Sequence, residues 1–147
     1  MRTLLVFLFL CLGLSLNINA QKINCGSTPS LPDKSWSIAM NPTVDDIVDF
    51  SKVNYKLIKL PEGSKITDFE KNAKMGLNAS TLEFFLKNPQ LIPEDWKGKI
   101  VVFTGTLFKD GGGSPLYKTL FYQDEKWQWG KAYPEYFLEN TYQLQLL

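Results

Sequence analysis

The chain has 147 residues, of which 44% are hydrophobic and 21% are charged, and its 16 basic residues nearly balance 15 acidic ones. This composition excludes a disordered or low-complexity protein, and the length fits one domain rather than two. The sequence contains no histidine. Ser–His and Cys–His nucleophiles and histidine metal sites are therefore excluded.

Residues 1–20 have the pattern of a secretory signal peptide. Arg2 provides a positive start, an apolar run extends from Leu4 to Leu16, and Ala20 precedes the expected cleavage site. The run is shorter than the roughly 20 apolar residues that span a bilayer. We therefore expect a secreted or periplasmic protein, with no stable membrane insertion after the signal is removed.

The chain that remains after cleavage has equal numbers of lysines and acidic residues, because Arg2 is the only arginine. Without net positive charge or arginine, we expect no binding to nucleic acid. Cys25 would be the only cysteine left, so an internal disulfide is excluded and a free thiol is favoured. No nucleotide-binding motif is present, and we expect neither a cofactor nor a metal.

The segment 21–42 is rich in proline and serine, which predicts a flexible leader before a single domain over residues 43–147. Within this leader, Trp36, Ile38 and Met40 alternate with polar residues, so they form a short strand or pack on the domain. Thr43 is followed by acidic residues and an apolar stripe, a pattern that predicts a helix ending near Asn54.

Further helices and one strand are expected before residue 90. The segment from Tyr55 to Leu60 is β-branched and aliphatic enough for a strand, and a helix is expected from about Lys65 to Met75. Ser80 and Glu83 have the spacing of a capping box, which predicts a helix that Asn88-Pro89 terminates.

In the last third of the chain, apolar residues recur at the two-residue spacing of β-strands. After one helical turn at Pro93–Trp96 and a glycine-rich loop between the first two strands, the expected strands are Ile100–Phe108, Leu116–Gln123, Lys126–Trp129 and Tyr142–Leu146. The order of elements predicts an α+β fold, with a helical N-terminal half packed on a C-terminal antiparallel β-meander of three to four strands.

The stretch from Leu91 to Gly130 also carries a set of short motifs. They are Pro-Glu-Asp-Trp-Lys-Gly-Lys from Pro93, Phe-x-Gly-Thr-x-Phe from Phe103, and Trp127-x-Trp129. In these motifs the chain resembles a small module of uncharacterised bacterial and phage proteins. The resemblance implies a structural motif, since no activity, ligand or catalytic residue accompanies that module.

More than half of the aromatic residues lie between Trp96 and Tyr142. Most are expected in the core, whereas Tyr122, Tyr133 and Trp129 are the candidate ligand-binding residues. With the usual catalytic groups missing, we favour a non-catalytic binding module whose partner is a protein or a glycan. The alternatives are a carboxylate-dependent hydrolase acting on glycan or cell wall, and an inhibitor or structural partner of another secreted protein.

Overall fold

The computed structural model describes residues 22–23, 27–41, 48–50, 54–61, 76–136 and 138–146. The signal peptide expected at residues 1–20, Cys25 and the helix expected over Lys65–Met75 lie outside these ranges. The elements are β1 (Lys22–Ile23), β2 (Ser37–Met40), β3 (Val48–Asp49), β4 (Tyr55–Lys59), α2 (Ala79–Lys87), the 3₁₀ turns η3 (Pro89–Leu91) and η4 (Glu94–Trp96), β5 (Ile100–Val102), β6 (Leu107–Lys109), β7 (Pro115–Gln123), β8 (Lys126–Ala132), the 3₁₀ turn η5 (Pro134–Tyr136) and β9 (Thr141–Leu146).

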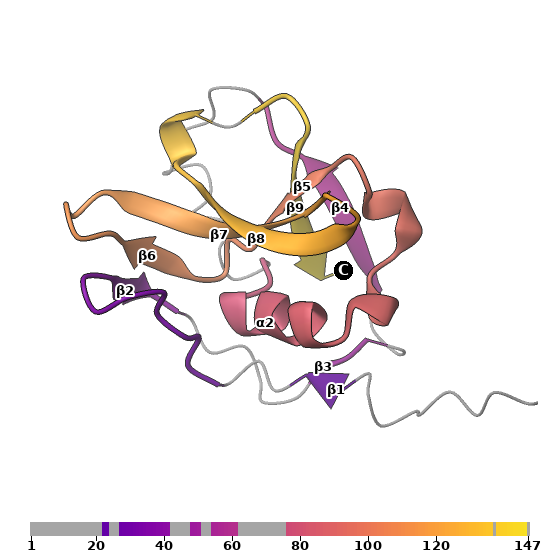
Figure 1. Ribbon diagram of the computed structural model, residues 1–147, viewed down its shortest axis with the longest axis horizontal. Helices are drawn as coiled ribbons and strands as arrows, with labels where there is room; N and C mark the ends of the chain where they lie inside the picture. The colour runs from indigo at the N-terminus through magenta and orange to yellow at the C-terminus, as the bar shows by residue number, and fades with distance from the viewer. Residues whose placement is uncertain are drawn as a thin grey trace, which may run out of the picture.

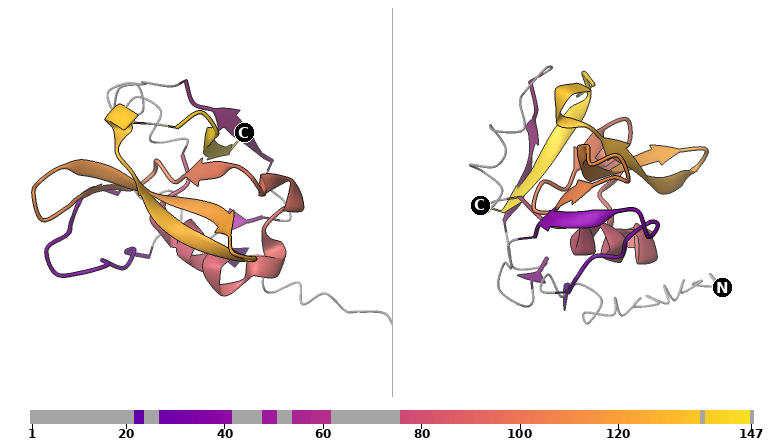
Figure 2. Two further views of the ribbon diagram at one scale, coloured as in Figure 1. Left: turned by 45° about the horizontal axis from the view of Figure 1, so that its top comes forward. Right: turned by 90° about the vertical axis from the view of Figure 1, so that its left-hand side faces the viewer.

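Seven of these strands form one sheet around β7 (Figure 1). Along one side, β7 pairs with β8, and along the other it pairs first with β6 and then with β5. Strand β9 adds in parallel to β5, β4 pairs with β9, and β2 pairs with β6. Figure 2 shows β7 and β8 as one long twisted ribbon, and this twist curls the sheet.

Helix α2 runs along one face of the sheet and builds the main core (Figure 1). Leu82 and Phe85 of α2 and Trp96 of η4 pack on sheet residues that are also fully buried, namely Val101, Leu120 and Leu144. Burial of a leucine or phenylalanine side chain contributes about 1.5–3 kcal/mol. The single long apolar stripe of α2 is therefore sufficient to fix the helix against the strands.

The expected fold class is wrong, both for the helical N-terminal half and for the antiparallel β-meander of three to four strands, because the sheet has seven strands and β9 pairs in parallel with β5. The N-terminal half is not helical where the structure describes it, since β2 and β4 belong to the sheet and α2 is the one α-helix of the described ranges. The helix expected from Thr43 is contradicted at Val48 and Asp49, which form β3 and pair with β1. Short apolar runs fit both periods, and here the pairing of strands from distant parts of the chain decides between them.

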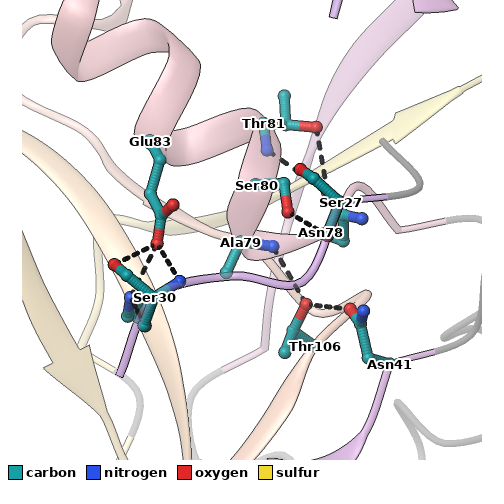
Figure 3. A network of polar contacts seen from close by, with 10 residues as sticks. Ser27, Ser30, Asn41, Asn78, Ala79, Ser80, Thr81, Glu83 and Thr106 are labelled. Carbon is teal, nitrogen blue, oxygen red and sulfur yellow. Dashed lines mark hydrogen bonds and ion pairs between the residues drawn. The ribbon is translucent and has the colours of Figure 1, made fainter. Parts of the chain in front are cut away.

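The strand expected from Ile100 to Phe108 is interrupted where the chain meets the start of α2. The amide of Gly105 donates to the carbonyl of Leu77 at 3.0 Å, and the amide of Ala79 donates to the Thr106 hydroxyl at 3.0 Å (Figure 3). A Cβ on Gly105 would lie 2.5 Å from the carbonyl oxygen of Gly76. Only glycine allows this approach, and it divides the expected strand into β5 and β6.

The helix expected at residue 80 exists, but its cap is not the predicted one. Asn78 is the N-cap, and its side chain accepts from the amide of Thr81 at 3.2 Å (Figure 3). Ser80 and Glu83 instead hold the segment that precedes β2: Ser80 donates to the carbonyl of Ser27, and Glu83 accepts from Ser30. Residues 27–41, the described part of the segment expected to be a flexible leader, thus pack on α2 and supply β2.

The other expected elements of the last third of the chain are confirmed. The turn at Pro93–Trp96 contains η4, the glycine-rich loop joins β6 to β7, and the last strand is β9. Strand β9, however, lies inside the sheet between β5 and β4. In the described ranges, the helices are too short or too polar to cross a bilayer.

Candidate functional site

Trp129 lines a surface hollow of about 190 Å³ between β8, α2 and the segment before β2. Its side chain is 40% exposed, which is unusual for a tryptophan beside a core. The walls are apolar and the polar groups come from three elements; the lining residues are Ser30, Pro32, Leu82, Glu83, Leu86, Lys118 and Trp129. This combination of apolar walls and a few converging polar groups is typical of small-molecule sites.

The polar part of this Trp129 hollow is an ion pair between β7 and α2. Nζ of Lys118 lies 3.1 Å from Oε1 of Glu83, and their side chains are 4% and 25% exposed. The same ammonium donates to the carbonyl of Ser30 at 2.7 Å. Burial of two charges is costly unless both are hydrogen-bonded, and here Lys118 has both a carboxylate and a carbonyl partner.

The Glu83 carboxylate uses one of its two oxygens. Oε1 accepts from the amide and the hydroxyl of Ser30 at 2.8 and 2.7 Å (Figure 3), and it also accepts from Lys118. Within the described part of the chain, no hydrogen bond reaches Oε2. The hollow therefore has zero net charge and keeps one acceptor available for a ligand.

The ring of Trp129 is held in position by contacts with Trp36 and Lys118. The Trp36 ring meets it edge-on, with centroids 6.4 Å apart, and Nζ of Lys118 lies 5.5 Å from its centroid. Trp36 itself is buried and packs on Phe108. Since Trp36 is fixed in the core, the Trp129 ring is positioned before any ligand arrives.

The other two predicted ligand residues lie elsewhere. Tyr122, on β7, packs edge-on against Trp127, and Nζ of Lys97 lies 4.4 Å from its ring centroid. A hydrogen bond to Glu94, 2.6 Å away, raises the pKa of Lys97 and keeps the ammonium over this ring. Tyr122 shares the sheet face of Trp129 but is no part of the Trp129 hollow.

Tyr133 follows β8 and contacts the glycine-rich loop that joins β6 to β7. Its hydroxyl donates to Oδ2 of Asp110 at 3.3 Å, and its ring packs on the cluster around Trp36. Loss of hydration raises the pKa of Tyr133, and the negative charge of Asp110 raises it further. Its hydroxyl thus helps to hold the loop.

Sequence reasoning missed Glu83, Lys118 and Ser30. A readable signal existed for Lys118, because it lies between Leu116 and Leu120 at the positions that face the core in a strand. A charged residue on a buried face requires a partner. The identity of that partner could not be read from the sequence, since Glu83 is on α2 and far away in the chain.

No family model matches the chain, and neither a curated protein nor a solved structure shows significant similarity to it. The resemblance of Leu91–Gly130 to a bacterial and phage module therefore stays a prediction. Among the described residues, no group of three acidic or cysteine side chains is arranged to hold a metal ion.

Proposed function

We propose that the protein is an exported, non-catalytic binding module that takes a neutral saccharide in the Trp129 hollow. The observation that carries the proposal is the exposed Trp129 ring beside a charge-neutral pair of the buried Lys118 with the partly exposed Glu83. A sugar ring has an apolar C–H face and a rim of hydroxyl groups. An indole ring can cover the first, while a carboxylate oxygen and an ammonium group can bind the second.

The charge and size of the hollow favour this ligand class. Lys118 is already neutralised by Glu83, so an anionic ligand would have to compete with a carboxylate 3.1 Å from the ammonium. The volume of about 190 Å³ is below the range of roughly 300–1,000 Å³ that is usual for drug-sized ligands. A single neutral ring is therefore a better match than a charged or extended molecule.

A protein partner is supported less well by the described surface. A standard protein interface covers roughly 800 Å² on each side and has an apolar centre. The exposed large apolar side chains of the described ranges are Leu31, Trp129 and Leu138. Leu31 adjoins the Trp129 hollow through Ser30 and Pro32, whereas Leu138 lines a different hollow.

No feature of the Trp129 hollow supports the alternative of a carboxylate-dependent hydrolase. Glycosidases use two carboxylates on either side of the scissile bond, separated by roughly 5–10 Å. The Trp129 hollow is lined by one carboxylate, and that group is paired with a lysine. The geometry therefore supports binding rather than hydrolysis.

The test is a glycan array that holds neutral and acidic glycans, followed by calorimetric titration with the neutral glycan that gives the strongest signal. Trp129→Ala should lower the affinity at least tenfold. Leu138→Ala removes an even more exposed apolar side chain outside the hollow and should leave the affinity unchanged. Binding only to acidic glycans, binding to none, or equal affinity of wild type and Trp129→Ala would refute the proposal.

A further inference from the structure

A second hollow, of about 420 Å³, opens at the other edge of the sheet beside β4 and β9. Two tyrosines from these neighbouring strands, Tyr55 and Tyr142, line it together with Lys56, Leu57, Pro93, Asp95, Trp96 and Lys99. It shares no residue with the Trp129 hollow. We refer to it as the Tyr55–Tyr142 hollow.

Strand register places the two hollows on the same face of the sheet. Tyr142 of β9 is opposite Val101 of β5, Val101 is opposite Leu120 of β7, and Leu120 is opposite Trp129 of β8. Residues directly opposite each other point to one face, so Trp129 and Tyr142 lie in a single cross-strand row, which continues from Tyr142 to Lys59 of β4. Three strand spacings separate them by roughly 14 Å.

The middle of this row is closed to ligands. Val101 and Leu120 are fully buried under α2 and η4, in the core that also contains Phe85 and Trp96. Trp129 and Tyr142 are not covered in this way, because Trp129 is exposed and Tyr142 is half-buried. The helical layer thus separates two open aromatic positions on one sheet face.

The polar groups of the two hollows are of the same kind. Nζ of Lys99 lies 3.4 Å from Oδ2 of Asp95, also donates to the Asp95 carbonyl, and lies 5.8 Å from the centroid of the Tyr142 ring. As at Trp129, an aromatic ring adjoins a lysine–carboxylate pair, and here the exposed Lys56 also lines the hollow and adds one positive charge. The Asp95 side chain is 75% exposed, so its carboxylate can be reached by a ligand.

The ring of Tyr55, the second tyrosine of the hollow, is fixed by its contacts with Trp96 and Phe50. It meets Trp96 edge-on at 6.1 Å between centroids and packs on Phe50 at 5.4 Å. Burial raises the pKa of Tyr55, and the nearby charge of Asp95 raises it further, so the phenol stays protonated at neutral pH and can donate a hydrogen bond. Two rings, one phenol donor and one exposed carboxylate face the same space.

We infer that the Tyr55–Tyr142 hollow is a second binding site for neutral saccharide, so that one molecule binds at two points. The inference rests on the proposed function for its ligand class, but on different residues for its location. The hollow has about twice the volume of the first, so it has room for a disaccharide where the Trp129 hollow takes one ring. Two sites on one face would raise the avidity for a polymer without new contacts.

The experiment is an NMR titration of the ¹⁵N-labelled protein with maltose, cellobiose, lactose and diacetylchitobiose. The indole N–H of Trp129 reports on the first site, and the backbone amides of Lys99 and Tyr142 report on the second. We expect one disaccharide to shift both sets. Shifts at Lys99 and Tyr142 alone would support the second site and refute the proposed function, whereas shifts at Trp129 alone would do the reverse. No shifts would refute both.

Variants then test whether the shifts at Lys99 and Tyr142 arise from binding in the Tyr55–Tyr142 hollow. Asp95→Asn and Tyr142→Ala should each weaken binding at the second site at least tenfold and leave the Trp129 shifts unchanged. The matched control is Glu94→Gln, which changes an adjacent acid that is 81% exposed and does not line the hollow. If Glu94→Gln has the same effect as Asp95→Asn, or if Asp95→Asn and Tyr142→Ala both bind like the wild type, the inference is overturned.

Discussion

Trp36 supports Trp129 through an edge-on contact in which the ring planes are inclined at 84°. The two residues come from distant parts of the chain and differ in exposure, since Trp36 is 5% exposed and Trp129 is 40% exposed. A buried ring therefore positions an exposed one. The segment before β2 is thus part of the framework of the Trp129 hollow.

This contact predicts that truncating the two tryptophans to alanine lowers the free energy of unfolding by different amounts. Trp36→Ala should lower the free energy of unfolding by about 3–5 kcal/mol, because it leaves a cavity beside Phe108. Trp129→Ala should lower it by less than about 1 kcal/mol, since much of that ring already faces water. Urea denaturation of both variants measures the difference. Equal losses of stability would contradict the view that the buried Trp36 positions the exposed Trp129.

The buried pair in the Trp129 hollow predicts a rescue. Glu83→Gln leaves the Lys118 ammonium buried without its counter-charge and should cost about 1–3 kcal/mol of stability. The double variant Glu83→Gln with Lys118→Met should recover most of that loss, because the uncompensated charge is gone. Chemical denaturation provides the test.

The control for the buried pair is the exposed pair of Glu94 with Lys97. Glu94→Gln should change the stability by no more than about 0.5 kcal/mol, because exposed ion pairs contribute little. A double variant at Glu83 and Lys118 that is less stable than Glu83→Gln alone would show that the pair is not held by its charges.

The turn between β7 and β8 predicts a stabilising change. Asp124 and Glu125 have φ angles of 51° and 60°, a conformation that side chains disfavour by about 1–2 kcal/mol per residue. Asn-Gly is the preferred pair in such two-residue hairpins. Asp124→Asn with Glu125→Gly should therefore raise the melting temperature, whereas Glu125→Ala, which removes the charge alone, should give no gain in a thermal scan.

The close approach at Gly105 predicts a contrast between two glycines. A Cβ on Gly105 would lie within 2.8 Å of the backbone nitrogen of Asn78, so Gly105→Ala should cost about 1–3 kcal/mol. At Gly112 the nearest atom is Oδ1 of Asp110 at 3.4 Å, an ordinary contact. Gly112→Ala should leave the stability nearly unchanged, and a loss as large as that of Gly105→Ala would contradict this packing.

Tyr55 predicts an alkaline limit to stability. Burial raises the pKa of its phenol above the ordinary value of 10.0. In the folded state the phenol binds its proton more tightly than in the unfolded state, so the stability it contributes is complete below about pH 10 and is lost as the pH rises through the folded pKa. Urea denaturation at several alkaline pH values should give a shallower decline for Tyr55→Phe; an identical slope would contradict the burial of this group.

The predictions from sequence succeeded where neighbours along the chain decide the outcome. Asn88-Pro89 ends α2, the turn at Pro93–Trp96 contains η4, and Tyr55–Lys59 forms a strand. Prediction failed at Val48 and Asp49, where the apolar spacing suggested a helix but pairing with Lys22 and Ile23 gives a strand. In short apolar runs the two periods cannot be separated without knowledge of the partner.

The candidate site shows the same division. Trp129 was among the aromatic candidates predicted from the sequence, and the charge of Lys118 between Leu116 and Leu120 was a signal open to sequence reasoning. The hollow itself needs Trp36, Ser30 and Glu83 in contact with these strands, and no pattern along the chain specifies those contacts.

The absence of histidine chemistry, the balance of charge, the aromatic character of the C-terminal strands and the turns that separate them depend on residue type and near neighbours, so they could be predicted from the sequence. Three features appear only in the folded protein: β9 enters the sheet between β5 and β4, Gly105 splits a strand, and Glu83 meets Lys118 beneath Trp129. They depend on contacts that join residues distant in the chain. Their stability arises from burial and hydrogen bonding that exist only once the sheet has formed.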